Sequence, residues 1–463
     1  MTTQADIAVI GGGLSGATAA LRAAGMGRDV VLVRKGYGGT AVGCGAFDVL
    51  VARSEEGRPR PFDARLGSDY DPALALARLI HRRPAHPYGL FIDGDAASRK
   101  DLWKSFRARF DVAAAFLLDR LAKAGYEMSG SAETLTAHCS AQGTLRWSNL
   151  TPLSVHRGNV ASWRKGRVAI VGVEGVDAFD SRFASRSLAA LLSDHFGTDP
   201  AKFEACTVSL PWARPSGGFL PAEVARDLDD PERRETFVTA LEGALEGSAC
   251  SHAVVAPLLG LDAHAEMLSL LEKRAGVRVS EPLIPAPHAI HGLRLQKALD
   301  QSLASAGVRI LQARVTGFEP AGNAVRALTG EEEAGPLRIE AKRYVLATGR
   351  FFGGGLVSEG RIRERIFDLP VFHGERAVRE RSVFSLLRPR YWARQPAFEA
   401  GLRAGGDMRP VDAAGRVLFV NLYAAGSILG GFDLATDGTS QGVDVLTGLE
   451  AAAAAAGDGS ALP

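Results

Sequence analysis

The hydrophobic positions near the start of the chain change from a strand-like to a helix-like pattern and back. A short apolar run over residues 6–10 predicts a strand, an Ala-rich stretch to about residue 24 predicts a helix, and residues 30–33 predict a second strand. A glycine-rich turn separates the first strand from the helix. This order is typical of a nucleotide-binding fold, in which the turn brings a phosphate to the helix N-terminus.

Three glycines, Gly11, Gly13 and Gly16, form that turn with the spacing GxGxxG. They are expected to provide a tight turn, a close approach of the backbone to a phosphate, and close packing of helix on strand. An acidic residue that holds a ribose hydroxyl is expected near the end of the second strand. Arg34 stands there instead, and Asp29 lies at the start of the strand. The phosphate half of a dinucleotide site is therefore present, and the adenosine half is missing.

Farther along the chain, the pattern predicts a second α/β unit and then a return to the first sheet. Residues 172–175 hold only half of a phosphate fingerprint, which indicates an ordinary structural crossover. The expected helices cover residues 99–124, 181–195, 292–306 and 440–456, the last capped by Ser440, and the expected strands cover 167–173, 206–210, 308–316, 341–347, 417–420 and 422–425.

Two later turns add to the first fingerprint. An ATG turn carries Thr348 and Gly349, and an AAGS turn before a helix carries Gly426 and Ser427. A two-segment flavoprotein wraps its cofactor at three such places, whereas nicotinamide enzymes do not need the last turn. A helix N-terminus after Gly426 would stabilise the negative charge that a flavin gains on reduction. The three motifs in this order predict a flavin.

The glycine-dense segment after the second predicted strand is expected to skirt the flavin ring. The residues expected there are Gly39, Thr40, Gly43 and Gly45. Cys44 lies in the same segment, and we interpret it as a small buried filler.

The predicted fold class is α/β, with a two-segment Rossmann-like flavin-binding domain and an inserted α/β domain. The first segment covers residues 1–55 and ends in a charged, Pro-containing loop near residues 54–61. The inserted substrate or cap domain covers residues 56–284, and the second flavin-binding segment covers residues 285–463.

Composition excludes several classes of function. The net charge is +2, with 54 basic and 52 acidic residues that are scattered, so nucleic acid is not an expected partner. No apolar run approaches the length of a membrane span, and the N-terminus lacks the features of a signal peptide. We therefore expect a cytoplasmic protein that reaches the membrane only through a partner. The four cysteines form no CxxC pair, so neither a disulfide framework nor a metal or iron–sulfur site is expected.

Several segments outside the flavin motifs carry a more specific similarity. They are AHPY at 85–88, GTLR at 143–146, VGVEGVDAF at 171–179, GLRLQ at 292–296, RFFGGGLV at 350–357 and GSILGGFD at 426–433. With the flavin motifs, the chain resembles the B subunit of anaerobic glycerol-3-phosphate dehydrogenase nearly from end to end. The resemblance implies oxidation of sn-glycerol 3-phosphate to dihydroxyacetone phosphate, with electrons passed toward quinone. It also implies two partners: an FAD-bearing subunit, which is a separate chain, and a membrane-associated iron–sulfur subunit.

The resemblance further implies FMN as the cofactor. FMN has one phosphate and no adenosine, so it tolerates a glycine turn without a ribose-binding acid. Two alternatives stay open: FAD whose ribose is held by other groups, and NADP whose 2′-phosphate is held by Arg34. We rank FMN first, FAD second and NADP third, and the family resemblance is the basis for this ranking.

Oxidation of a secondary alcohol needs a base for the hydroxyl proton and cations for the phosphate. The candidate bases are His86, His288 and His291, and the candidate phosphate ligands are Arg146, Arg294 and Arg350. Each of these residues also has a structural interpretation, as a hydrogen-bonded loop histidine or a surface charge. A second hypothesis is therefore that this chain is a non-catalytic electron-transfer or assembly component, with the alcohol oxidised in the FAD-bearing partner.

Overall fold

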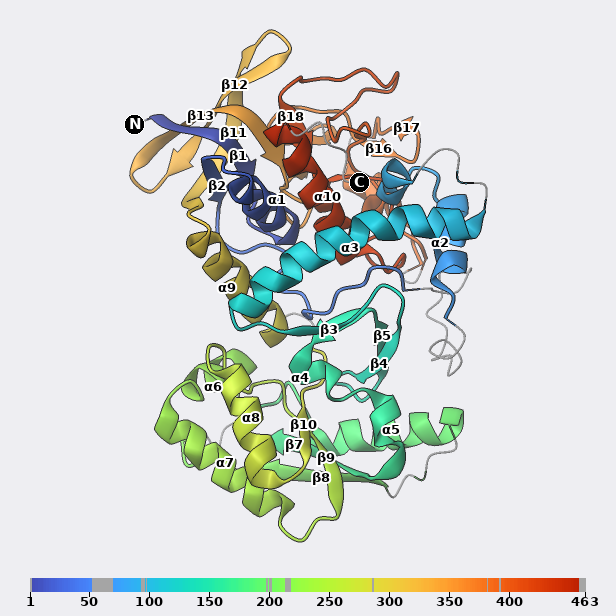
Figure 1. Cartoon of the computed structure of the whole chain (residues 1–463), viewed down its shortest axis with the longest axis vertical. Coiled ribbons are helices and arrows are strands. Elements are labelled where there is room, and N and C mark those ends of the chain that lie inside the picture. Colours follow the sequence, from blue (N-terminus) through green and yellow to red (C-terminus); the bar gives the residue numbers. More distant parts are fainter. Residues whose placement is uncertain are drawn as a thin grey trace.

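Two stretches far apart in the chain build one sheet in the upper lobe of the computed structural model (Figure 1). Its parallel core has the order β11-β2-β1-β13-β18, and β12 joins the far ends of β11 and β13 in an antiparallel meander. The strands are β1 (Thr2–Ile10), β2 (Val30–Arg34), β11 (Arg309–Ala321), β12 (Ala324–Glu332), β13 (Gly335–Leu346) and β18 (Leu422–Ala424). The structure describes residues 2–51, 70–92, 96, 98–196, 199, 202–212, 218–284, 287–380, 382–390 and 393–457.

Helices cover this sheet because its central strands carry apolar residues that are buried, mainly toward their carboxyl ends in β1 and β13. All five residues of β2 are buried, as expected for a parallel strand that is covered on both faces. The long apolar helix α10 lies against α1, which is itself buried along most of its length. The helices of this lobe are α1 (Leu14–Gly25), α2 (Pro72–Arg82), α3 (Arg99–Lys123), α9 (Ile290–Ser305) and α10 (Ser440–Ala456).

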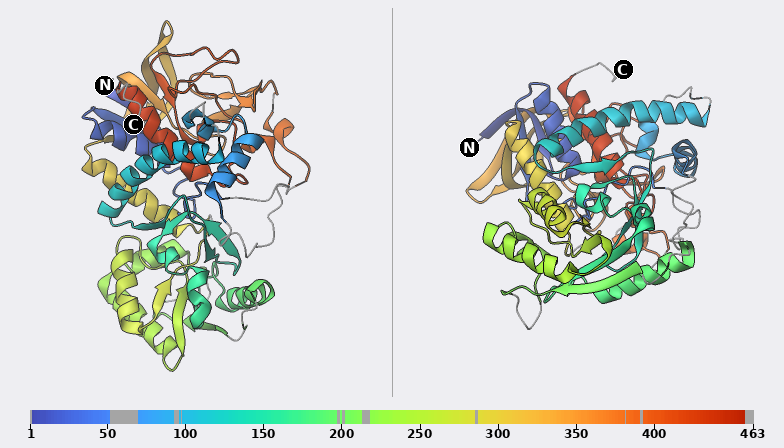
Figure 2. Two further views of the ribbon diagram at one scale, coloured as in Figure 1. Left: turned by 45° about the vertical axis from the view of Figure 1, so that its right-hand side comes forward. Right: turned by 60° about the horizontal axis from the view of Figure 1, so that its bottom comes forward.

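The lower lobe holds a second, fully parallel sheet with the order β10-β9-β7-β8 and its own hydrophobic core (Figures 1 and 2). Helix α5 is the crossover between β7 and β8, as the half fingerprint at residues 172–175 indicates. The elements are β7 (Arg167–Val173), β8 (Phe203–Val208), β9 (Cys250–Val255), β10 (Arg278–Ser280), α5 (Ser181–Phe196), α6 (Pro221–Asp227), α7 (Pro231–Leu245) and α8 (His264–Ala275).

Short hairpins and turns join the two lobes and enclose the carboxyl edge of the upper sheet. Between the lobes lie β3 (Met128–Gly130), β4 (Thr136–Cys139), β5 (Leu145–Ser148), β6 (Leu150–Pro152) and α4 (Leu153–His156). The upper lobe adds β14 (Leu356–Ser358), β15 (Ile362–Glu364), β16 (Phe372–His373) and β17 (Arg376–Ala377). The 3-10 helices are η1 (Pro87–Phe91), η2 (Val160–Lys165), η4 (Val383–Leu386), η5 (Pro396–Phe398) and η6 (Gly426–Ile428).

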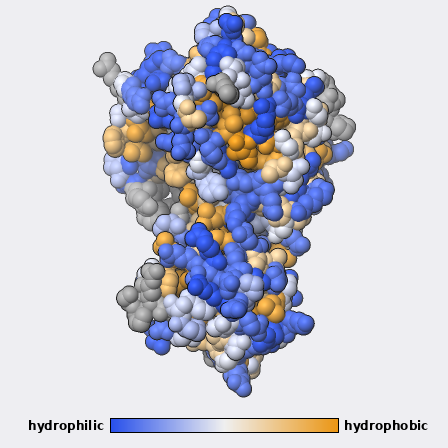
Figure 3. All heavy atoms as spheres, turned by 90° about the vertical axis from the view of Figure 1, so that its left-hand side faces the viewer, coloured by the Kyte–Doolittle hydropathy of each residue, from blue (hydrophilic) through white to orange (hydrophobic). Residues whose placement is uncertain are grey.

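The surface is consistent with two separately cored lobes. On the face drawn in Figure 3, hydrophilic side chains cover most of both lobes, and hydrophobic side chains gather in patches on the upper lobe and at the waist. No helix in the described part of the chain is long and apolar enough to cross a membrane. Within the same residues, no group of three or more His, Cys, Asp or Glu side chains has the arrangement of a metal site.

The two-segment α/β architecture predicted from the sequence is confirmed, and four local expectations need correction. The strand expected at 206–210 lies at Phe203–Val208. Residues 417–420 form no strand; only Val417 makes an isolated bridge, with Val411, because it follows a turn held by Asp412. Ser440 starts α10 but does not cap it, since its hydroxyl donates to the carbonyl of Leu434 at 3.0 Å.

The fourth correction concerns the AAGS turn. Gly426 and Ser427 enter only the short 3-10 helix η6, and the next α-helix, α10, begins later at Ser440. The expected stabilising helix N-terminus therefore does not follow Gly426 directly.

The predicted domain limits stay predictions. The limit between residues 55 and 56, the charged loop after residue 54, and residue 285 all lie outside the described residues. Helices α2 and α3 fall in the predicted inserted segment, but their buried side chains belong to the core of the upper lobe. We therefore propose that the smaller lobe begins after α3.

Candidate functional site

The glycine turn between β1 and α1 is shaped by contacts that leave no room for side chains. Gly11 has a φ of 114°, and a Cβ at this position would collide with the backbone of Ala347. A Cβ at Gly16 would collide with the carbonyl oxygen of Gly11. At Gly13 the nearest atom to such a Cβ is Oγ1 of Thr40, at 3.3 Å. Two of the three glycines thus serve the fold itself, and Gly13 faces open space.

That open space is a cavity of about 740 Å³ at the carboxyl edge of the upper sheet, where parallel α/β folds place their ligands. It is lined by residues 10–15, 33–40, 42, 313–315, 347–354, 365, 366, 383, 387, 397, 398, 427, 434, 440, 441 and 444.

Many of the sequence-predicted cofactor residues meet at this cavity. Gly11, Gly13, Gly39, Thr40, Thr348, Gly349 and Ser427 line it. Thr40 also accepts a hydrogen bond from the Leu14 N–H at 2.8 Å. This bond joins the glycine-dense segment after β2 to the start of α1.

The other predicted cofactor residues, Gly16, Gly43, Gly45 and Gly426, do not line the cavity but pack the chain around it. Gly45 and Gly426 have φ values of 74° and 75°, a backbone conformation that favours glycine. A Cβ at Gly45 would lie 2.7 Å from Cβ of His291. The carbonyl oxygen of Gly43 lies against Gly292, where a Cβ would overlap it.

The polar floor of the cavity contains Thr348, which the sequence predicted, and two residues that it did not predict, Ser15 and Asp444. The hydroxyl of Ser15 is buried without a hydrogen-bond partner, and so is that of Thr348. The Asp444 carboxyl lines the cavity beside them, and burial raises its pKa to about 7 despite a hydrogen bond from the backbone of Ser427. For Ser15 and Asp444, the only signals in the sequence were a serine inside the fingerprint and an acid in a largely apolar helix.

Several basic side chains line the cavity. Arg34 at the end of β2 is held by Asp300, whereas Lys35 and Arg314 lie nearby without an ion pair among the described residues. Arg365 lines the cavity and is half-buried, and no described carboxylate pairs with it.

Arg350 lines the cavity, but most of its guanidinium N–H groups donate hydrogen bonds to other residues of the protein. Its terminal nitrogens donate to the carbonyl oxygens of Phe398, Phe432 and Leu429, and the guanidinium carbon lies 4.5 Å from the centre of the Phe432 ring. Burial lowers its pKa to about 9. Only Nε is left without a partner.

The histidine candidates lie away from the cavity. His86 is 2% exposed; its Nδ1 accepts from the Tyr88 N–H at 3.1 Å, and its Nε2 lies 3.0 Å from Oγ1 of Thr439. Burial lowers the pKa of His86 to about 3. It lines a separate cavity of about 250 Å³. His288 is half-buried, and neither it nor His291 lines the main cavity.

His291 and Arg294 belong to a buried cluster between the lobes. Arg294 donates to both carboxylate oxygens of Glu281, at 2.5 and 3.0 Å, and to the carbonyl of Gly260. Burial alone would raise the pKa of Glu281, but the charge of Arg294 lowers it to about 2. His291 lies 3.0 Å from the Pro282 carbonyl oxygen. These satisfied contacts join α9 to the end of β10.

Arg146 also makes protein contacts outside the main cavity. It donates to Asp48 at 2.8 Å and contacts the Cys44 sulfur, and Asp48 is the main cause of its raised pKa. Cys44 is half-buried and not fully enclosed, in contrast to the filler expected from the sequence.

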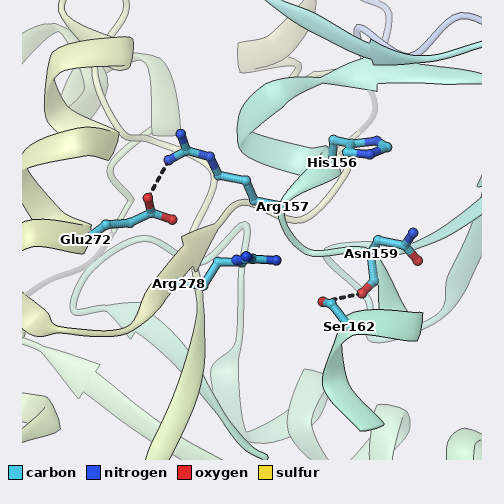
Figure 4. A pocket seen from close by; sticks show the side chains of 6 residues that line it. All are labelled: His156, Arg157, Asn159, Ser162, Glu272 and Arg278. Atoms are coloured by element: carbon cyan, nitrogen blue, oxygen red, sulfur yellow. Dashed lines mark hydrogen bonds and ion pairs between the residues drawn. The ribbon is translucent and has the colours of Figure 1, made fainter. Parts of the chain in front are cut away.

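A further cavity, of about 420 Å³, lies in the lower lobe at the amino end of β10 (Figure 4). Arg157 points toward Glu272 there, with an N–O distance of 2.7 Å, and Ser162 donates to the carbonyl of Asn159. Parallel sheets bind ligands at their carboxyl edge, so this cavity is not favoured as the functional site.

Comparison with known proteins agrees with the geometry. The family described as FAD binding domain matches residues 6–443. A protein from Pectobacterium atrosepticum, named as the B subunit of anaerobic glycerol-3-phosphate dehydrogenase, is 30% identical over 472 residues, which cover 96% of this chain and 97% of the relative. The protein of the same name from Actinobacillus succinogenes is 29% identical over 465 residues, with coverages of 96% and 97%.

A solved structure of 3-ketosteroid delta1-dehydrogenase from Sterolibacterium denitrificans is 14% identical, with a TM-score of 0.45 and coverages of 99% of this chain and 100% of that one. The family match and the curated relatives span nearly the whole chain. The chain therefore belongs to the FAD binding domain family, as a relative of proteins named as the B subunit of anaerobic glycerol-3-phosphate dehydrogenase, and its cofactor is a flavin.

Proposed function

We propose that this chain catalyses the flavin-dependent oxidation of sn-glycerol 3-phosphate to dihydroxyacetone phosphate. In this proposal, electrons pass toward a membrane quinone through two partners, an FAD-bearing subunit and an iron–sulfur subunit, and the chain stays peripheral to the membrane through them. End-to-end similarity to proteins named for anaerobic glycerol-3-phosphate dehydrogenase supports this reaction. In this proposal, the flavin and the substrate bind in the cavity at the carboxyl edge of the upper sheet.

The residues of the cavity fit a flavin. Gly13 leaves space at the N-terminus of α1, where backbone N–H groups and the helix dipole favour a phosphate. The unpartnered hydroxyls of Ser15 and Thr348 offer hydrogen bonds that the protein does not complete by itself. When bound, the flavin supplies the acceptor for a hydride from the alcohol carbon.

We propose FAD ahead of FMN, which reverses the order implied by the family resemblance. The cavity continues past the glycine turn to the end of β2 and the middle of β11, where Lys35 and Arg314 line it. FMN ends at its single phosphate, so only the adenosine half of FAD would extend into this region. Mass spectrometry of the flavin released by denaturation separates the two, and release of FMN alone would reject this assignment.

Arg365 is the single observation that most favours a phosphate-bearing substrate. It lines the flavin cavity without a carboxylate partner among the described residues, whereas Arg146 and Arg294 are engaged in ion pairs. Arginine pairs well with phosphate because two of its N–H groups match two phosphate oxygens. We therefore assign Arg365 to the substrate phosphate.

The test is anaerobic reduction of the bound flavin, followed by its visible absorbance. We expect sn-glycerol 3-phosphate to bleach the flavin and glycerol to act poorly. Arg365→Gln should raise the substrate concentration for half-maximal reduction by about tenfold or more, the effect of losing one charge-assisted hydrogen bond. Arg361→Gln is the matched control, because Arg361 is exposed and pairs with Asp368 outside the cavity.

The same experiment separates the second hypothesis. If the substrate leaves the flavin of this chain oxidised, but reduces it once the FAD-bearing partner is added, then the alcohol is oxidised in that partner. This chain would then serve electron transfer or assembly.

A further inference from the structure

Two polar side chains from distant parts of the chain converge on Gly426 at the lining of the flavin cavity. Ser15 comes from the first turn of α1, and Asp444 from the second turn of α10. Both approach Gly426: a Cβ added there would lie 2.7 Å from Ser15 Oγ and 2.7 Å from Asp444 Oδ1. The packing of α10 against α1 therefore places a hydroxyl and a carboxyl side by side.

The burial of the Ser15 hydroxyl without a partner indicates that a ligand hydrogen-bonds to this part of the cavity. The residue is 5% exposed, it lines the cavity, and its hydroxyl has no hydrogen-bond partner. The Thr348 hydroxyl, which comes from the turn after β13, lines the same cavity in the same unpartnered state. A buried hydroxyl without a partner is unfavourable, and burial already disfavours the charge on Asp444.

The position along the cavity identifies the part of the cofactor. The glycine turn at Gly13 is expected to hold the phosphate, and the turn at Gly426 and Ser427 is expected to lie near the ring. Ser15 follows Gly13 by two residues and, like Asp444, approaches Gly426, so both side chains lie where the two turns meet. In a flavin, the group between the phosphate and the ring is the ribityl chain, whose hydroxyls both donate and accept hydrogen bonds.

We propose that Ser15 and Asp444 are positioning residues that bind the ribityl hydroxyls of the flavin, with Thr348 contributing a third contact. The carboxyl of Asp444 accepts from a ribityl hydroxyl, and the Ser15 hydroxyl either donates or accepts. This assignment depends on the flavin and not on the proposed substrate. It also holds for FMN and FAD alike, because both contain the ribityl phosphate.

The test compares FMN with an analogue whose ribityl phosphate is replaced by an unsubstituted five-carbon alkyl phosphate. Both ligands are titrated into flavin-free protein, and binding is followed by flavin fluorescence. We expect wild-type protein to bind FMN about tenfold or more tightly than the analogue. Ser15→Ala and Asp444→Ala should each weaken FMN binding by about tenfold or more and leave analogue binding unchanged.

The matched control is Thr18→Ala on the same helix. The Thr18 hydroxyl is buried but donates to the Leu14 carbonyl within α1, so its removal should affect the two ligands equally. If Asp444→Ala does not fold, Ser15→Ala carries the test by itself. Equal losses for FMN and the analogue in the Ser15 variant, or no loss for FMN, would overturn the proposal.

Discussion

Arg34 and Asp300 form a two-point ion pair at the end of β2, with N–O distances of 2.6 and 2.8 Å. Gln296 extends the pair, because its amide donates to Asp300 at 2.9 Å and to the carbonyl of Gly12 at 3.1 Å. The basic residue at the usual ribose-binding position thus braces the glycine turn. Asp300 pairs with both terminal nitrogens of Arg34 and neutralises its charge, which disfavours a role in binding the 2′-phosphate of NADP.

The first prediction follows from this pair. Arg34→Glu would place two carboxylates together in a largely buried site, where the side chains of Arg34 and Asp300 are 7% and 22% exposed. We expect the free energy of unfolding to fall by roughly 3–5 kcal/mol, as for other broken buried pairs. Urea denaturation measures the loss, and the charge-swapped Arg34→Glu/Asp300→Arg protein should recover much of it. A single variant as stable as wild type would contradict the bracing role.

The second prediction separates glycines that serve the fold from the glycine that serves the cofactor. Gly16→Ala should destabilise the protein even without flavin, because its Cβ would meet the backbone of Gly11, which cannot move away cheaply. Gly13→Ala should fold normally, and Gly13→Val should weaken flavin binding by filling the cavity. Thermal unfolding and flavin titration read out the two effects separately. Full flavin retention by a folded Gly13→Val protein would refute this assignment.

The third prediction concerns pH. His86 is neutral when folded because burial lowers its pKa to about 3, whereas it takes up a proton near pH 6.5 when unfolded. Its contribution to stability is therefore complete above about pH 6.5 and is lost as the pH falls toward 3. The slope is at most about 1.4 kcal/mol per pH unit for this one proton.

The measurement is urea unfolding at several pH values between 5 and 7. His86→Gln keeps a side chain that bonds Thr439 but removes the titration, so its stability should fall less steeply with acidification than that of wild type. His138 and His264, which are also held neutral by burial, stay in both proteins and provide a common background. Parallel curves would show that His86 does not titrate on unfolding.

The fourth prediction tests the buried pair between the lobes. Arg294→Met would leave Glu281 fully buried with a charge and one backbone donor, the N–H of Leu259, and should cost roughly 3–5 kcal/mol of unfolding free energy. Arg294→Met/Glu281→Gln should be markedly more stable than the single variant, because no uncompensated charge stays buried. A single variant that lost catalysis but no stability would instead place Arg294 at the substrate.

The sequence by itself determined the β1–α1–β2 unit, the glycine turn and the two-segment sheet. These features depend on the spacing of apolar residues and on glycines whose effects are confined to a few neighbouring residues. Patterns in the local sequence can therefore predict them. It also identified most of the turns that surround the cavity, including those at Thr348 and Ser427. The short strand expected at residues 417–420 failed because an apolar run needs a neighbouring strand before it becomes one.

Only the tertiary structure decided what the charged and polar side chains do. His86 hydrogen-bonds to Thr439, which is 353 residues away in the sequence, and Arg34 pairs with Asp300, which is 266 residues away. Nothing in the residues around His86 or Arg34 indicates which group will lie opposite. Ser15 and Asp444 were missed for the same reason: a hydroxyl or carboxyl becomes part of a site only when packing buries it without a partner, and the packing of α10 on α1 does this.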